Sequence, residues 1–202
     1  MASPLQIRPY QPADWPAVWA LLEPVFRAGE TFPHDPAITQ EQAQVAWVEQ
    51  SQVVMVAVDG AAGTAVGTYY LRPNSLALGA HVVNAGYVVA EHGRRQGIGS
   101  RLCQHSLQEA RRLGFRAMQF NLVVSTNTAV IRCWQRNGFR VVGTLPGAGL
   151  KKIRFCRLIH SPELFWLEWH QCSQSQSCLN QLERDAQSAQ IEGLIRLSSV
   201  GS

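Results

Sequence analysis

The sequence contains no long hydrophobic run, and none of its apolar stretches approaches the roughly 20 residues that a membrane-spanning helix requires. Residues 1–8 also lack the apolar core of a signal peptide. From these two absences we expect no membrane partner and a cytoplasmic location for the protein.

Cysteine is sparse, and its five positions show no spacing typical of a metal-binding pair. The number is odd, so a disulfide framework is not expected, and reduced thiols agree with a cytoplasmic location. Cys103 and Cys133 stand among apolar residues of predicted helices, so we interpret them as core residues rather than nucleophiles. The sequence therefore predicts no metal site.

A long basic stripe with interleaved aromatic residues, which nucleic-acid binding favours, is missing too. The formal net charge is +4, which indicates either a slightly cationic surface or attraction of an anionic ligand. The second interpretation rests on Arg94, Arg95 and Arg101, which stand close together. With 202 residues and 46% hydrophobic content, the chain is long and apolar enough for a folded domain with a full core.

The stretch 87–102 carries the most informative pattern of the chain. It predicts a strand that passes through a basic, glycine-bearing turn into a helix. The first N–H groups of a helix lack intrahelical partners and lie at the positive end of its dipole. Gly97 and Gly99 allow the backbone to approach a ligand closely, while Arg94 and Arg95 add positive charge. The turn therefore predicts a site for a phosphate or pyrophosphate.

Strands and helices are predicted on both sides of this turn. Apolar side chains at helical spacing predict a helix over 15–27, with Asp14 as its N-cap, and a helix over 39–50, with Thr39 and Gln42 as a capping box. A meander followed by alternating strands and helices favours a mixed α/β or α+β sheet. Further helices are predicted over 98–113 and 128–136, the latter after a cap at 125–127, and strands over 5–8, 53–58, 67–72, 81–89, 115–124 and 139–143, with 150–160 and 164–170 as additional strand candidates.

Two segments resemble a known family. Residues 94–99, Arg-Arg-Gln-Gly-Ile-Gly, resemble the Q/R-x-x-G-x-G/A loop by which GCN5-related N-acetyltransferases (the GNAT family) bind the pyrophosphate of acyl-CoA. Residues 127–139 resemble the segment N-x-x-A/V-I-x-x-Y/W-x-x-x-G-F, which follows later in that family. The resemblance extends over about residues 5–149, and two motifs in the family's order are more specific than the glycine pattern alone. Within the family, residues 29–33, 83–87, 119–127 and 142–150 are similar to the yeast-type azetidine-2-carboxylate acetyltransferases.

The resemblance implies the GNAT fold, an α/β (α+β) domain whose mixed, mostly antiparallel central sheet has about six to seven strands and about four flanking helices. It implies an acetyltransferase domain over 1–149 and leaves 150–202 as an atypical C-terminal segment. Residues 151–157 do not match the family's usual last strand. We consider two explanations, a divergent ending and a frameshift in the gene. Beyond residue 170 the chain is polar, which predicts a weakly structured tail.

The activity implied is transfer of an acetyl group from acetyl-CoA to the amine of a small molecule, with an amino acid or imino-acid analogue as a candidate acceptor. Two alternatives remain open: a catalytically weak CoA-binding or regulatory protein, and a protein N-acetyltransferase. No nucleic-acid partner is expected, and analogy makes a homodimer a candidate assembly.

The resemblance also assigns catalytic and cofactor-binding positions. The strand 87–89 is expected to splay from 119–121, so that backbone groups near Val89 contact the pantetheine arm and the thioester carbonyl. Glu30 is the candidate base, with a merely solvated loop carboxylate as the alternative. Trp134 stands where the family often has a tyrosine that protonates the leaving thiolate. Because an indole N–H is no proton source at neutral pH, we expect Trp134 to pack and water to protonate the thiolate. The predicted cofactor-binding residues are Val88, Val89, Arg94, Arg95, Gln96, Gly97, Ile98, Gly99, Ser100, Asn127 and Trp134.

Two asparagines in predicted strands are assigned to the acceptor. Asn84 and Asn121 are expected on neighbouring strands, near the place where these strands separate. Strand interiors disfavour asparagine, so we interpret the pair as holding the acceptor's carboxylate or amine, with purely structural hydrogen bonding as the alternative. Thr31 and Phe32 complete the predicted acceptor site. His81 and His92 are expected at the surface.

Overall fold

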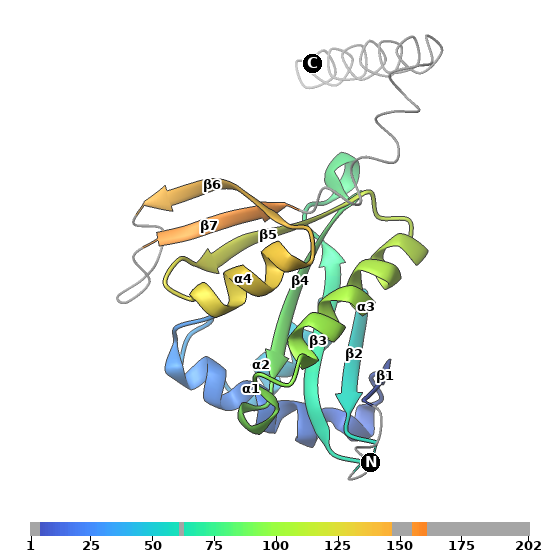
Figure 1. The fold of residues 1–202 in the computed structure, drawn as a ribbon. Helices are drawn as coiled ribbons and strands as arrows, with labels where there is room; N and C mark the ends of the chain where they lie inside the picture. The colour runs from blue at the N-terminus through green and yellow to red at the C-terminus, as the bar shows by residue number, and fades with distance from the viewer. Residues whose placement is uncertain (1–4, 61–62, 147–154, 161–202) are drawn as a thin grey trace, which may run out of the picture. The chain divides into compact units, whose positions relative to one another are not determined.

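The computed structural model describes residues 5–60, 63–146 and 155–160, all of which belong to the unit Met1–Leu164 (Figure 1). The strand candidate at 164–170 and the predicted polar tail lie outside the described residues, and the domain boundary near residue 150 stays a prediction. No helix within the described ranges is both long and apolar enough to cross a membrane.

A seven-stranded sheet forms the centre of the fold, with strand order β1-β2-β3-β4-β5-β7-β6 (Figure 1). Neighbouring strands are antiparallel except β4 and β5, which are parallel and joined through a helix. The predicted mixed, mostly antiparallel sheet is therefore confirmed. The strands are β1 (Gln6–Pro9), β2 (Val53–Val58), β3 (Ala65–Pro73), β4 (Val82–Val89), β5 (Ala117–Val124), β6 (Arg140–Pro146) and β7 (Phe155–His160).

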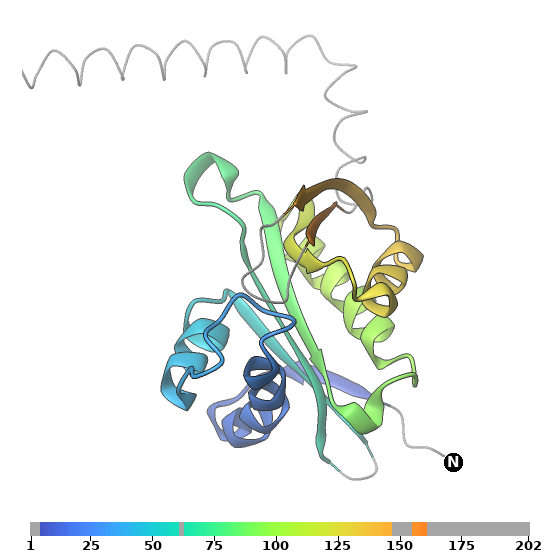
Figure 2. The ribbon, with the colours of Figure 1, turned by 90° about the vertical axis from the view of Figure 1, so that its left-hand side faces the viewer.

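Four α-helices cover the sheet, α1 and α2 on one face and α3 and α4 on the other (Figures 1 and 2). α2 begins at the predicted capping box, in which the N–H of Gln42 donates to Thr39 Oγ1 at 3.2 Å and the N–H of Thr39 donates to Gln42 Oε1 at 3.0 Å. The helices are α1 (Trp15–Ala28), α2 (Gln40–Gln44) with its π-helical continuation η2 (Val45–Glu49), α3 (Ile98–Arg112) and α4 (Thr128–Arg136), and the short 3-10 turns are η1 (Pro12–Asp14), η3 (Ala77–Gly79) and η4 (Glu91–Gly93).

Asp14 occupies the predicted N-cap position of α1, but its carboxylate accepts no hydrogen bond from the first turn. Both carboxylate oxygens instead accept from the guanidinium of Arg8 at 2.7 Å, and one also accepts from the N–H of Gln11 at 2.8 Å. A bidentate arginine is a stronger partner for a carboxylate than a single backbone N–H, so Asp14 links β1 to the start of α1.

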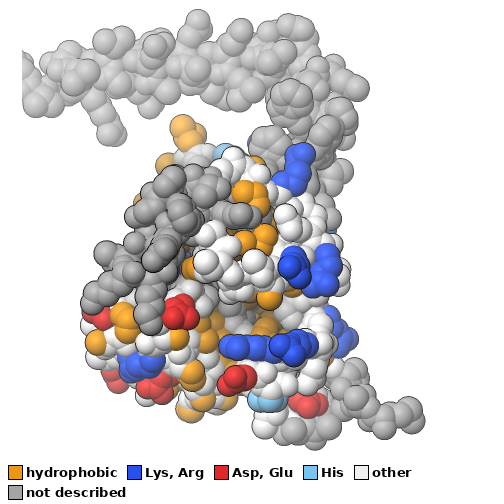
Figure 3. Space-filling model, turned by 60° about the vertical axis from the view of Figure 1, so that its left-hand side comes forward, with side chains coloured by type: hydrophobic (Ala, Val, Ile, Leu, Met, Phe, Trp, Pro, Cys, Tyr) orange, Lys and Arg blue, Asp and Glu red, His pale blue; other side chains and the backbone are white. Residues whose placement is uncertain are grey.

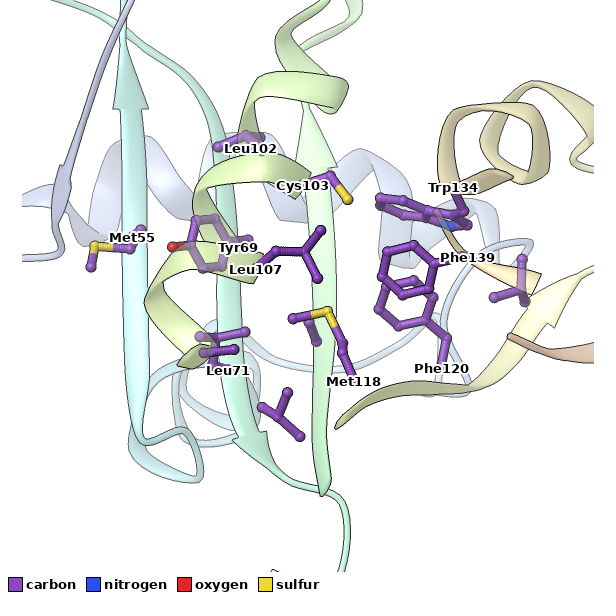
Figure 4. Close-up of a cluster of buried hydrophobic side chains, with 14 of the residues drawn as sticks. Met55, Tyr69, Leu71, Leu102, Cys103, Leu107, Met118, Phe120, Trp134 and Phe139 are labelled. Carbon is purple, nitrogen blue, oxygen red and sulfur yellow. The ribbon is translucent and has the colours of Figure 1, made fainter. Parts of the chain in front are cut away.

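Each face of the sheet carries its own hydrophobic core. On the α3–α4 face, Leu102, Cys103 and Leu107 of α3 pack toward Met118 of β5 and Trp134 of α4, as Figure 4 shows. Cys103 is fully buried, which confirms its interpretation as a core residue. On the other face the buried side chains come from α1, α2, η2 and strands β2 to β4. The sheet is therefore held from both sides, and its middle strands lie between the two cores.

The last described strand, β7, lies between β5 and β6 and is antiparallel to both. The strand candidate at 150–160 is therefore confirmed for residues 155–160, while 150–154 lie outside the described residues. β5 thus pairs with β4 along one edge and with β7 along the other. Divergence and a frameshift are both compatible with this strand, and resequencing the gene distinguishes them.

Candidate active site

Strands β4 and β5 run side by side only over their first residues. Their parallel pairing ends at Val83 and Met118, although both strands continue for several residues. Over the same length β4 keeps its antiparallel pairing with β3 as far as Val89. The predicted splay of 87–89 from 119–121 is therefore confirmed.

This separation leaves backbone groups of β4 at an edge that no strand covers. The N–H of Ala90 donates to the carbonyl of Val66 in β3 at 2.9 Å. Successive N–H groups of a strand point to opposite edges, so the N–H of Val89 points to the edge that β5 has left, as does that of Tyr87. Donors at such an edge can bind a linear polar ligand or polarise an acyl oxygen.

The exposed turn after β4 leads directly into α3. Arg95 and Gly97 both adopt left-handed backbone conformations, with φ of 65° and 78°. Gly97 is the N-cap of α3, and among the described residues no side chain forms a capping hydrogen bond at this end of the helix. A Cβ placed on Gly97 would meet no atom within 4 Å. The first N–H groups of α3 are thus open to a ligand, and the helix dipole together with Arg94 and Arg95 favours an anion.

Other predicted cofactor-binding residues of this region also make structural contacts. Gln96 Nε2 donates to the carbonyl of His92 at 2.9 Å, which closes the turn on itself. The hydroxyl of Ser100 accepts from Asn137 Nδ2 at 3.1 Å, which joins α3 to the end of α4. Ile98 is 7% exposed and packs into the core beneath the turn. The side chains of Gln96, Ser100 and Ile98 therefore hold the turn and the start of α3 in place. Binding of a ligand by the backbone of these residues stays a prediction.

The end of β4 lies against the first turn of α3. A Cβ on Gly99 would lie 4.0 Å from Val89 Cγ2, so the helix start and the strand edge are adjacent. Val88 points to the opposite face of the sheet and is buried in the core there. The open strand edge and the uncapped helix end thus form one continuous surface.

Two predicted cofactor-binding residues belong to α4. Asn127 Oδ1 accepts from the N–H of Val130 at 3.3 Å, so this side chain is the N-cap of α4. Trp134 is 7% exposed and packs against Tyr87 and Phe120, with ring centroids 4.7 and 4.9 Å away. The expectation that Trp134 packs is confirmed. Contact of either residue with a cofactor stays a prediction.

The predicted acceptor residues lie on the two strands that separate. Asn84 of β4 is half-buried and directly follows Val83, the last residue of β4 that pairs with β5. Asn121 of β5 donates through Nδ2 to Asn74 Oδ1 at 2.6 Å and accepts from Gln119 Nε2 at 3.2 Å. Asn84 and Asn121 are therefore on neighbouring strands, as predicted. The structural interpretation accounts for Asn121, whose amide ties β5 to the loop after β3.

An arginine that the sequence analysis missed stands beside Asn84. Arg72 of β3 is aligned with Asn84 in the strand register, and its guanidinium lies 4.8 Å from the ring centroid of Tyr70. Tyr70 lies close to β4 because Gly86 has no side chain: a Cβ there would be 2.5 Å from the tyrosine ring. Within the described residues, no carboxylate forms an ion pair with Arg72. This places a half-buried positive charge next to the strand separation.

The loop between α1 and α2 carries the remaining predicted residues. Both ribbon views place this loop beside the middle of β4 (Figures 1 and 2). Phe32 packs edge-to-face against Phe26 and Trp47 at 5.6 and 5.5 Å. Thr31 is half-buried and Glu30 is exposed. The loop is thus held by Phe32 to the core of the α1–α2 face.

His34 in the same loop is a second residue that the sequence analysis missed. Its ring packs against Phe26 at 5.0 Å and Phe32 at 6.2 Å. Burial lowers the pKa of His34, and the positive charge of Arg72 lowers it further. His81 and His92 are exposed, as predicted. Alternation along the predicted strand 67–72 puts Tyr70 and Arg72 on one face and could have marked Arg72, whereas no periodicity marks His34 in its loop.

The surface near the strand separation is basic on one side. Figure 3 shows Lys and Arg side chains gathered along one side of this face, with hydrophobic side chains beside them. On α4, a shallow cavity of about 400 Å³ is lined by Arg132, Gln135 and Arg136. With Arg94 and Arg95, these arginines give α3 and α4 a basic surface that can attract an extended anionic ligand.

The comparisons with known proteins agree with this geometry. The family described as the Acetyltransferase (GNAT) family matches residues 15–139. The chain is 31% identical over 138 residues to "N-acetyltransferase aca1" of Schizosaccharomyces pombe, an alignment that covers 61% of this chain and 66% of the relative. The chain thus spans slightly less than two thirds of that relative's length.

Solved structures show the same fold. A GCN5-related N-acetyltransferase from Kribbella flavida is 42% identical with a TM-score of 0.73, over 78% of this chain and 97% of that chain. The protein yncA of Salmonella typhimurium, described as a putative acetyltransferase with its cofactor acetyl-CoA, is 24% identical with a TM-score of 0.68, over 78% and 92%. Since the family match covers more than half of the sequence, the chain belongs to the GNAT family of acetyltransferases.

Proposed function

We propose that this protein transfers an acetyl group from acetyl-CoA to the amine of a small molecule that also carries a carboxylate. The observation that supports the proposal most directly is the separation of β4 from β5, which is followed along the chain by the turn that leads into the start of α3. An open strand edge that continues into an anion site matches a ligand with an amide-bearing arm and a pyrophosphate.

The residues of the chain fit acetyl-CoA. The N–H groups from Arg95 to Ser100 would hold the pyrophosphate, because this helix start is open and no side chain caps it. The unpaired edge of β4 at Tyr87 and Val89 would hold the pantetheine arm. Arg132 and Arg136 add positive charge on the adjacent helix. Asn127 and Trp134 stay predicted neighbours of the same arm.

When bound, acetyl-CoA supplies the acetyl group as a thioester. The N–H of Val89 points to the open edge of β4 and can donate to an acyl oxygen there, which stabilises the charge that develops on it. The chain otherwise contributes by holding both reactants in one geometry. The solvent supplies the proton for the departing thiolate, because Trp134 is buried and its indole is no acid at neutral pH.

For the acceptor, we propose a site on the α1–α2 face of β4. Arg72 would pair with the carboxylate, while Asn84 would donate to it or accept from the amine. Phe32 and Thr31 in the loop after α1 would border the acceptor's apolar part. The similarity of several segments to azetidine-2-carboxylate acetyltransferases makes cyclic imino acids the first acceptors to test.

The experiment is release of CoA thiol from acetyl-CoA with a panel of amines, in which each amino or imino acid is matched with its carboxyl-free analogue. We expect transfer to carboxylate-bearing amines and much weaker transfer to their analogues. Binding of CoA without transfer to any amine would instead indicate a regulatory CoA-binding protein. Transfer only to peptide N-termini or lysines would indicate a protein acetyltransferase.

A further inference from the structure

The loop after α1 brings an imidazole to the proposed acceptor site. His34 is half-buried, and its ring packs against Phe26 of α1 and Phe32 of the same loop, which also contact each other. Phe32 is itself fixed by its edge-to-face contact with buried Trp47. Contacts with these two aromatic rings restrict the orientation of the imidazole, so it is a positioned group rather than a mobile surface histidine.

The charged neighbours of His34 come from three elements. Arg72 of β3 is the charge that acts on the imidazole, and Tyr70 of the same strand lies under the guanidinium. From α1, Arg27 is engaged with loop carbonyls and with Glu23. Within the loop, the Asp35 carboxylate accepts from the N–H of Ala37 at 2.8 Å, and Glu30 is exposed. The dominant neighbour is therefore a cation, which disfavours the charged imidazolium.

Arg72 connects His34 with the acceptor position on β4. It is aligned with Asn84, one residue beyond the last pair that joins β4 to β5. A carboxylate bound at Arg72 would bring the amine of the same small molecule within a few ångströms of this region. It would also neutralise the charge that opposes protonation of His34.

We propose that His34 is the group that takes the proton from the acceptor's ammonium, and that an acceptor carboxylate bound at Arg72 switches this base on. The proposal rests on the proposed function, since it concerns the acceptor of that reaction. In the step, an N–H bond of the ammonium breaks, its electron pair stays on nitrogen as the lone pair, and the proton bonds to the imidazole. The imidazolium then releases the proton to solvent.

His34 suits this role better than Glu30, which the sequence favoured. Free ammonium groups have pKa values of about 8 to 10, and proton transfer is efficient when the base has a pKa near the working pH. In the free protein the lowered pKa of His34 keeps the imidazole neutral at pH 7, ready to accept a proton. A solvent-exposed carboxylate is a much weaker base toward an ammonium.

The first test is a titration of the histidine ring signals by NMR on the full chain without acetyl-CoA. His34→Gln identifies the His34 signal. We expect the pKa of His34 to lie below the ordinary histidine value, and its midpoint to rise when azetidine-2-carboxylate is added but not when azetidine is added. In Arg72→Gln the midpoint should be raised already and respond little. A His34 signal whose midpoint does not move with a saturating acceptor, or whose pKa is not below the ordinary histidine value, overturns the proposal.

The second test compares acetylation rates of His34→Gln, Glu30→Gln and the exposed control His81→Gln. Because general base catalysis contributes roughly 10²-fold or more, His34→Gln should lower kcat by about that factor with strongly basic amines, with little change in KM. The loss should shrink for acceptor amines whose pKa lies below 7, since they arrive deprotonated. His81→Gln should match the unmodified protein, and Glu30→Gln should lose less than His34→Gln.

The outcomes separate the two proposals. If the unmodified protein acetylates no amine, the proposed function fails. If it acetylates amines but His34→Gln loses the same factor with every amine, or Glu30→Gln carries the larger loss, only the assignment of His34 fails.

Discussion

Replacing Arg72 with glutamine tests the acceptor site directly. The side chain is half-buried beside Asn84, and no described carboxylate pairs with it, so its charge is available for a ligand. A hydrogen bond to a charged group contributes about 1.5–3 kcal/mol, which corresponds to a roughly 10- to 100-fold loss of kcat/KM for an acceptor with a carboxylate. For the matched amine without a carboxylate, kcat/KM should stay within about threefold, because that contact does not exist there.

The assay is steady-state release of CoA thiol with azetidine-2-carboxylate and with azetidine. Arg140→Gln is the control, since Arg140 is an exposed arginine at the start of β6. Loss of the contact with Tyr70 should lower the stability of Arg72→Gln by only about 0.5–1 kcal/mol, which thermal unfolding verifies. Equal losses with both acceptors, or no loss with either, would refute the assignment of Arg72 to the carboxylate.

Three further changes test other parts of the site and fold. Gly97 and Gly63 both occupy left-handed positions open to solvent, so replacing either with alanine should cost roughly 1–2 kcal/mol of stability. Gly97→Ala should also weaken CoA binding measured by calorimetry, whereas Gly63→Ala should leave CoA binding unchanged. Asn84→Ala should raise the acceptor KM or lower kcat without changing acetyl-CoA affinity, and unchanged acceptor kinetics would contradict its role. Arg8 lowers the pKa of Asp14, so their pair stabilises the fold above the ordinary carboxyl pKa, and this stabilisation is lost as the pH falls through the lowered pKa. Asp14→Asn should therefore lower Tm at pH 7, and its difference from the unmodified protein should shrink as the pH falls below the ordinary carboxyl pKa. A Tm difference that does not shrink with falling pH would contradict this.

The accuracy of the sequence analysis depended on how local the signal was. The capping box of Thr39 and Gln42 was predicted correctly because both partners lie within one helical turn. Asp14 was correctly predicted as the N-cap residue of α1, but its carboxylate makes no capping hydrogen bond because a guanidinium from β1 binds it instead. Asn127 was correctly predicted as a helix cap, yet its predicted contact with the cofactor depends on a ligand and stays a prediction.

For Trp134, the sequence predicted that the side chain packs but not which side chains it contacts. Its helical spacing and the chemistry of indole predicted packing, which the contacts with Tyr87 and Phe120 confirm. Which side chains surround it followed only from the sheet, because Tyr87 and Phe120 belong to the two strands that separate.

The chain's own local pattern was enough to establish the turn at 94–100, the helix that follows it and the family to which the domain belongs. Glycines, arginines and a helix start act over a few neighbouring residues, so their chemistry can be read directly from the order of amino acids. The meeting of His34, Arg72 and Asn84 could not be read in this way. A loop without periodicity, a strand position and a second strand come together only because packing of Phe32 and pairing of β3 with β4 fix them in space. For this reason the cofactor side of the site could be predicted from the sequence, whereas the proposed base and its cation emerged from the fold.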